Sequence, residues 1–177
     1  IFDDTRSITE PAGALALGAL GVLVACSTPE QGRTSAATLD AASFGPVSGM
    51  LLARCGSLDC HGSRYRNYRL VGNGAGRLDG PDAASTPEDT EATAAEVAYN
   101  FQSTLGVEPE TMREVAAAKG AGADRLTLVR KGRGQEAHKG DQRIVPGDAA
   151  DRCSLSWLAG ATDTTAGKDA LVEPREG

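Results

Sequence analysis

Two of the four cysteines and one of the two histidines of this 177-residue chain fall within a single short segment. The segment reads Cys55-Gly56-Ser57-Leu58-Asp59-Cys60-His61-Gly62. Thiols and an imidazole at this density can form a disulfide, bind a metal ion or hold a metal-containing cofactor. Each of these requires the fold to present the segment as a compact loop, which constrains the chain more than any other feature.

Three chemistries are compatible with this loop. C-x-x-C-H is the attachment signature of a c-type haem, in which two thiols bond to the vinyl groups and the histidine ligates iron; here the spacer has four residues. A disulfide could instead join Cys55 to Cys60, or join Cys153 to one of them, and the longer bridge would contribute about 2–4 kcal/mol. Zinc is the third interpretation, with Cys55, Cys60, Cys153 and either His61 or His138 as a Cys3His set.

The N-terminal region contains an uncharged, mostly apolar run at residues 12–25, which ends in Leu23-Val24-Ala25-Cys26. The run is shorter than the roughly 20 residues of a transmembrane helix and has the length of a signal-peptide core. Its end resembles a bacterial lipobox, in which the cysteine accepts the lipid; a buried apolar helix is the alternative. We therefore expect a lipoprotein signal segment at 1–26, lipidation at Cys26, and a polar, flexible tether at 27–43.

Helical periodicity begins after Phe44. A short helix is predicted from Pro46 into the cysteine loop, and a last helix from Pro146-Gly147-Asp148 to Gly160. Between them the pattern predicts a helix starting at Thr86-Pro87-Glu88-Asp89 and ending at Gly106, and another from Pro109 to near Gly120. The run at 126–129 is a strand-like connector or one buried turn, and 130–143 is a loop.

These elements predict an all-α fold: a small domain at residues 44–160 with about four short helices and long loops. Only 4% of the residues are aromatic and 22 are glycines, so the core is expected to be small. The Thr/Ala/Glu-rich residues 161–177 are predicted to be a disordered tail.

Charge and motif content argue against two classes of function. The formal net charge is −6 and no dense basic patch is available, which argues against nucleic acid as a partner. The cluster Arg64, Arg66 and Arg69 is a local exception, expected to be a solvated rim or a propionate partner. No nucleophile elbow is present and neither histidine stands in a recognisable catalytic motif, so the chain is not expected to be an enzyme.

The order of the features resembles the cytochrome-c-like domains of exported bacterial lipoproteins. A helix runs into the C…CHG loop, Gly76-Arg77-Leu78-Asp79 follows, and Ile144-Val145-Pro146-Gly147-Asp148 precedes the terminal helix with Trp157. The resemblance covers roughly residues 44–160. It departs from the family in the four-residue spacer and in Cys153, where an apolar or small residue is usual.

The resemblance implies one covalently attached haem and electron transfer. Cys55 and Cys60 would form the thioethers, and His61 would be the proximal iron ligand. His138 and Met112 are the candidates for the sixth ligand, and His138 is favoured because its loop could fold over the haem, whereas a methionine at helical spacing is more often core.

Further implications concern the surroundings of such a haem. Arg64 or Arg66 would neutralise a propionate, and the partner would be an unidentified redox or envelope protein. The membrane would be reached through the lipid anchor, at the periplasmic or outer surface of the cell envelope. The rival hypothesis is a lipoprotein without a cofactor, in which a disulfide fixes the fold of a binding or structural module.

Overall fold

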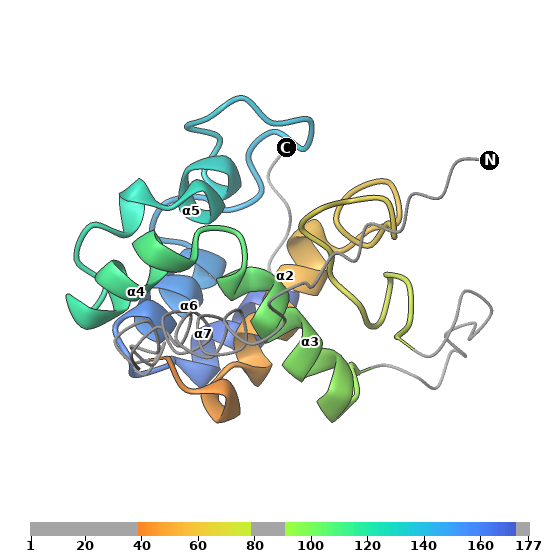
Figure 1. The fold of residues 1–177 in the computed structure, drawn as a ribbon, viewed down its shortest axis with the longest axis horizontal. Coiled ribbons are helices and arrows are strands. Elements are labelled where there is room, and N and C mark those ends of the chain that lie inside the picture. Colours follow the sequence, from red (N-terminus) through yellow and green to blue (C-terminus); the bar gives the residue numbers. More distant parts are fainter. Residues whose placement is uncertain (1–38, 79–90, 173–177) are drawn as a thin grey trace, which may run out of the picture. The chain divides into compact units, whose positions relative to one another are not determined.

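The computed structural model of the chain describes residues 39–78 and 91–172 (Figure 1). Every regular element in these ranges is a helix, apart from an isolated bridge between Val71 and Gly76. The all-α prediction is therefore confirmed for the described part of the chain. The predicted signal segment 1–26, with Cys26, and residues 27–38 of the predicted tether lie outside the described residues.

The described helices follow one another as η2 (Ala41–Ser43), α2 (Gly45–Cys55), α3 (Ala94–Leu105), α4 (Pro109–Ala117), η3 (Ala123–Arg125), α5 (Thr127–Gly132), α6 (Ala149–Leu158) and α7 (Thr164–Val172). Across residues 39–78 and 91–172, none of these helices combines the length and the apolar character needed to cross a bilayer.

Helix α2 carries the cysteine loop at its C-terminal end. Pro46 stands in its first turn, where the missing N–H costs nothing, and Val47, Met50 and Leu51 are buried along one side. The helix ends at Cys55, and the N–H of Gly56 donates to the carbonyl of Leu52 at 2.9 Å. A Cβ atom at Gly56 would lie 2.6 Å from that carbonyl oxygen, so the position requires glycine.

Helix α3 begins later than the sequence predicts. Residues 91–93 are not helical, so a continuous helix to Gly106 from the predicted start at Thr86–Asp89, which itself lies outside the described residues, is wrong. Thr93 forms a capping box: its hydroxyl accepts from the N–H of Glu96, and the Glu96 carboxylate accepts from the N–H of Thr93. This reciprocal pair satisfies two N-terminal donors, which a proline seven residues earlier cannot do.

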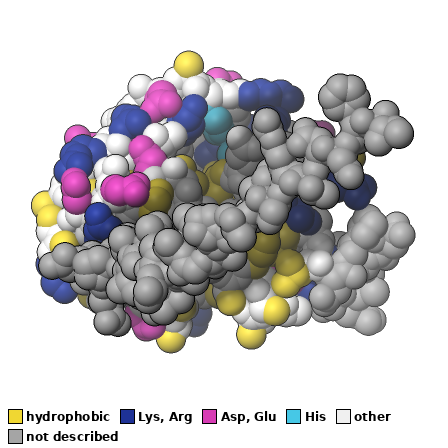
Figure 2. All heavy atoms as spheres, viewed as in Figure 1, with side chains coloured by type: hydrophobic (Ala, Val, Ile, Leu, Met, Phe, Trp, Pro, Cys, Tyr) yellow, Lys and Arg dark blue, Asp and Glu magenta, His cyan; other side chains and the backbone are white. Residues whose placement is uncertain are grey.

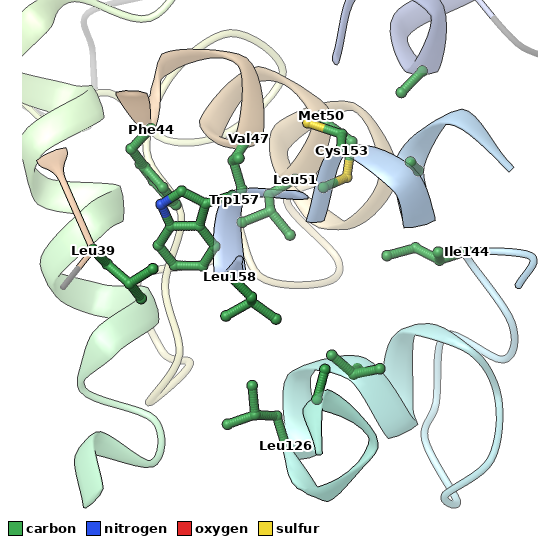
Figure 3. Close-up of a cluster of buried hydrophobic side chains, with 14 of the residues drawn as sticks. Leu39, Phe44, Val47, Met50, Leu51, Leu126, Ile144, Cys153, Trp157 and Leu158 are labelled. Atoms are coloured by element: carbon green, nitrogen blue, oxygen red, sulfur yellow. The ribbon is translucent and has the colours of Figure 1, made fainter. Parts of the chain in front are cut away.

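The aromatic centre of the core joins three segments, and Figure 3 shows two of its rings, those of Phe44 and Trp157. The ring centroid of Trp157 on α6 lies 5.0 Å from that of Phe44 and 6.4 Å from that of Phe101 on α3. Phe44 and Phe101 are themselves 5.4 Å apart, at an angle of 68°. Edge-to-face packing of this kind stabilises aromatic clusters beyond the area that they bury.

Two predicted boundaries of the domain are wrong. Leu39 is buried in the core and the carboxylate of Asp40 caps η2, so the end of the predicted tether belongs to the fold. Residues 164–172 form α7, which packs against α2 and α6 through small buried residues, so this part of the predicted disordered tail is ordered. A Cβ atom at Gly167 would lie 2.6 Å from Cβ of Pro46, which explains how closely α7 approaches α2.

The run at 126–129 forms a helical turn at the start of α5, the second of the two predicted alternatives. Leu126 precedes the helix, and Leu126 and Val129 are buried. The carbonyl of Gly132, at the end of α5, accepts hydrogen bonds from Arg143 and Ile144, each at 2.9 Å. The loop between Arg133 and Arg143 is therefore closed at its base, and it carries His138.

Candidate cofactor-binding site

The cysteine loop is wound tightly by its own backbone. The N–H of His61 donates to the carbonyl of Cys55 at 3.1 Å, and the carbonyl of Ser57 accepts from Cys60 at 2.9 Å and from Gly62 at 3.0 Å. A Cβ atom at Gly62 would lie 2.1 Å from the carbonyl oxygen of Gly56, so only glycine fits there. The loop thus holds both thiols and the imidazole in one compact turn.

His61 is fixed by Tyr68 in two ways. Its Nδ1 lies 2.9 Å from the carbonyl oxygen of Tyr68, and its ring centroid lies 4.7 Å from the Tyr68 ring. The Tyr68 hydroxyl lies 3.2 Å from the Thr104 hydroxyl on α3. A carbonyl partner assigns the proton of a neutral imidazole to Nδ1, so Nε2 keeps the lone pair that a metal ion requires.

The electrostatic surroundings keep His61 neutral. Burial lowers the pKa of His61 below its usual value, and the positive charges of His138, Arg66 and Lys131 lower it further. The hydrogen bond to Tyr68 opposes these effects without cancelling them. A neutral imidazole can coordinate a metal ion without first releasing a proton.

The loop that carries His138 is anchored by ion pairs at the end of α5. Glu136 pairs with Arg130 at 2.9 Å and with Lys131 at 3.2 Å, and the Lys131 ammonium also donates to the carbonyl of Ala137 at 3.3 Å. These contacts fix the two residues that precede His138. They therefore limit where its side chain can lie.

The two histidines of the chain, which are far apart in the sequence, meet in the structure. Their ring centroids are 6.0 Å apart and their planes are nearly parallel, at 13°. The Nδ1 of His138 lies 3.4 Å from the carbonyl oxygen of Asp141, so both rings turn Nδ1 toward a backbone carbonyl. Figure 2 shows histidine atoms at the surface among Lys and Arg side chains.

Gly140 provides the space for the His138 ring. Its backbone has no positive φ, but a Cβ atom there would lie 2.7 Å from Cε1 of His138. We expect Gly140→Ala to push the half-exposed His138 ring out of line with His61, and to change the free energy of unfolding by less than about 1 kcal/mol, since a loop side chain can move aside. Urea denaturation and the distance-dependent NMR cross-peaks between the two rings measure the two effects.

Gly45→Ala is the matched control, since a Cβ atom there would have no neighbour within 4 Å. It is expected to leave the ring contact unchanged. Unaltered cross-peaks in Gly140→Ala would contradict this account of how His138 is held.

The remaining predicted site residues occupy two different environments. Met112 is 2% exposed on α4 and belongs to the hydrophobic core. Arg64 and Arg66 are exposed: the Arg64 guanidinium lies 5.5 Å from the Tyr65 ring centroid, and Arg66 donates to the carbonyl of Asp59 at 3.3 Å. Of these two arginines, Arg66 acts on the site, because its positive charge lowers the pKa of His61.

No disulfide joins any of the three described cysteines to another. Cys55 and Cys60 are half-buried, whereas Cys153 is fully buried on α6, in the same cluster as Met50 (Figure 3). Burial raises the pKa of Cys153 to about 11, so this thiol is unreactive. The predicted bridge from Cys153 to the loop is not formed. A Cys3His zinc site would require at least three metal-binding side chains close together, and over residues 39–78 and 91–172 no three His, Cys, Asp or Glu side chains are grouped in this way.

Comparison of the chain with protein-family models, curated proteins and solved structures finds no match. The chemistry of the site therefore has to be argued from its own geometry.

The residue types gathered at the site are those that a covalently attached haem requires. Two half-buried cysteine thiols stand in one tight loop, next to a neutral imidazole whose Nε2 is available, and a second imidazole lies parallel to the first. Metal–imidazole bonds are about 2 Å long, so two rings that share one metal ion through their nitrogens have centroids about 6 Å apart. The His61 and His138 centroids are 6.0 Å apart, and the rings could share a metal ion only edge to edge, because the nitrogen lone pairs lie in the ring planes.

Three residues of the site have roles that sequence reasoning missed. Tyr68 positions His61, Gly140 makes room for His138, and Lys131 anchors the His138 loop. The glycine two positions after His138 is the one signal in the sequence that could have indicated a crowded ring. The roles of Tyr68 and Lys131 depend on contacts that no local pattern reveals.

Proposed function

We propose that this protein is an envelope lipoprotein with a cytochrome-c-like domain, which holds one covalently attached haem and transfers electrons. The observation that carries the proposal is the parallel arrangement of His61 and His138, 6.0 Å apart, beside the cysteine loop. Two imidazoles on opposite sides of an iron ion are a common axial set for haem proteins. The lipid anchor rests on the lipobox-like segment that ends at Cys26.

Each residue of the site has a stated role in this proposal. Cys55 and Cys60 bond to the haem vinyl groups, which holds the cofactor even when the protein unfolds. His61 is the proximal ligand, and its hydrogen bond to the Tyr68 carbonyl fixes the ring and increases its basicity. The bound haem supplies the one-electron chemistry, and the chain binds it, orients it and limits its contact with water.

His138 is the sixth ligand in preference to Met112. His138 is half-buried and its ring lies near the His61 ring, whereas Met112 packs inside the core. The positive charges of Arg66 and Lys131 beside His61 favour a haem that carries anionic propionates.

The attachment site can be located by mass spectrometry. Trypsin cuts after Arg54 and Arg64 and releases residues 55–64, which contain both loop cysteines and His61. We expect the haem mass on this peptide after expression in an envelope with haem-ligation machinery. The tryptic peptide 153–168 is the internal control, because it contains the buried Cys153 and should carry no haem. Haem on the control peptide, or on neither, would contradict the proposal.

A further inference from the structure

A cleft of about 400 Å³ opens beside the cysteine loop, on the segment between Leu58 and Leu78. Among the described residues, its lining contains three arginines, one tyrosine and no acidic residue. The lining residues are Leu58, Gly62, Ser63, Arg64, Tyr65, Arg69, Gly76, Arg77 and Leu78. The segment from Cys60 to Leu78 carries four arginines and no Asp or Glu, in a chain whose net charge is −6.

The Arg77 side chain is held in place by a buried carboxylate. It pairs at 2.9 Å with Glu96, whose carboxylate is 2% exposed and also accepts from the N–H groups of Thr93 and Leu78. The pair neutralises one positive charge of the cleft. Arg77 nevertheless keeps one buried donor, Nη1, without a partner among the described residues.

Arg69 is the second partly buried arginine of the cleft. The hydroxyl of Ser103 holds its backbone, because it donates to the Arg69 carbonyl at 2.7 Å and accepts from the Arg69 N–H at 3.3 Å. A Cβ atom at Gly76 would lie 3.4 Å from Nη2 of Arg69, so the glycine leaves room around the guanidinium. The Nε atom of Arg69 is also buried and has no partner within the described ranges.

We propose that this cleft binds an oxyanion of the carboxylate or phosphate class between Arg69 and Arg77, with Arg64 at its rim. Guanidinium groups match the geometry of such anions and can donate two parallel hydrogen bonds. Arg69, Arg77 and the exposed Arg64 place three positive charges around the cleft, and among the described residues Glu96 offsets one of them. The anion is either a propionate of the attached haem or a small free anion, and the site itself does not depend on the haem.

The test uses the full chain expressed without haem-ligation machinery and titrated with inorganic phosphate, against sodium chloride at equal ionic strength. We expect saturable NMR shifts at the backbone amides of Gly62, Gly76 and Leu78 with phosphate only. Arg69→Gln should weaken binding at least tenfold, and Arg64→Gln, which changes an exposed residue and cannot unfold the chain, should weaken it severalfold. Arg113→Gln, an exposed change on α4, should leave it unchanged.

Shifts that do not saturate, or equal affinity in all three variants, would overturn the proposal. The same titration of the reduced, haem-bearing protein identifies the source of the anion. Loss of phosphate binding in the haem-bearing protein would show that a propionate occupies the cleft. Unchanged binding would show that the cleft takes up a free anion. A chain that attaches no haem would refute the proposed function and leave the first titration intact.

Discussion

Replacing His138 by alanine is expected to leave the haem attached and to remove its sixth ligand. Cys55, Cys60 and His61 stay in place in this variant, because the loop that they share is wound by its own backbone hydrogen bonds. The visible spectrum of the oxidised protein should change from the six-coordinate, low-spin form to a high-spin form. Absorption spectroscopy and electron paramagnetic resonance measure this change.

Added imidazole should restore the low-spin spectrum of His138→Ala, since it supplies the missing nitrogen ligand from solution. Met112→Leu is the matched control: it conserves volume in the core, costs less than about 1.5 kcal/mol and should leave the spectrum unchanged. A high-spin spectrum in Met112→Leu together with a low-spin spectrum in His138→Ala would reverse the assignment of the sixth ligand.

Trp157→Ala is expected to cause the largest loss of stability of any single change in the core. The side chain is 1% exposed and its ring packs against both Phe44 and Phe101. Truncation removes apolar burial and leaves a cavity, which typically costs about 3–5 kcal/mol for a buried tryptophan. The free energy of unfolding in urea, measured on the protein without haem, tests this value.

Trp157→Phe separates ring packing from the rest of the side chain. The indole Nε1 is buried without a partner among the described residues, so its removal relieves an unsatisfied donor while an aromatic ring remains. We expect Trp157→Phe to cost clearly less than Trp157→Ala. Equal losses in the two variants, or a loss below about 1 kcal/mol for alanine, would show that this cluster is not the centre of the core.

Local signals were sufficient for the elements next to the cysteine loop. Pro46 and the apolar spacing of Val47, Met50 and Leu51 predicted α2, and the CHG sequence predicted a compact loop after it. The last predicted helix also formed, with Cys153 and Trp157 on its buried side. In these segments propensity, periodicity and tertiary packing favour the same structure.

The errors arose where packing decides the structure. Helix α7 has little apolar character, and it is ordered because Ala166, Gly167 and Ala170 let its backbone approach α2 and α6 closely. The start of α3 was placed too early because Pro87 is a strong local signal, whereas the capping box of Thr93 and Glu96 satisfies actual donors. Neither effect is visible in a hydrophobic pattern.

The sequence could suggest the pairing of His61 with His138, but local patterns alone do not require it. The pairing depends on the Tyr68 carbonyl on one side, and on Lys131 and Gly140 on the other. Tyr68, Gly140 and the Ala137 carbonyl that Lys131 contacts all stand in loops that lack regular structure, for which no periodicity rule exists. The resemblance to cytochrome-c-like domains supplied the hypothesis, and the ring geometry gives it a physical argument.

The most direct test of the proposed function is the mass of the denatured protein, recorded with its visible spectrum after expression in an envelope with haem-ligation machinery. Attachment through Cys55 and Cys60 predicts a Soret band and a haem mass that survives denaturation. A mass lower by two hydrogens, with no Soret band, would instead show a disulfide and contradict the haem assignment. The chain would then be a binding or structural module without a cofactor.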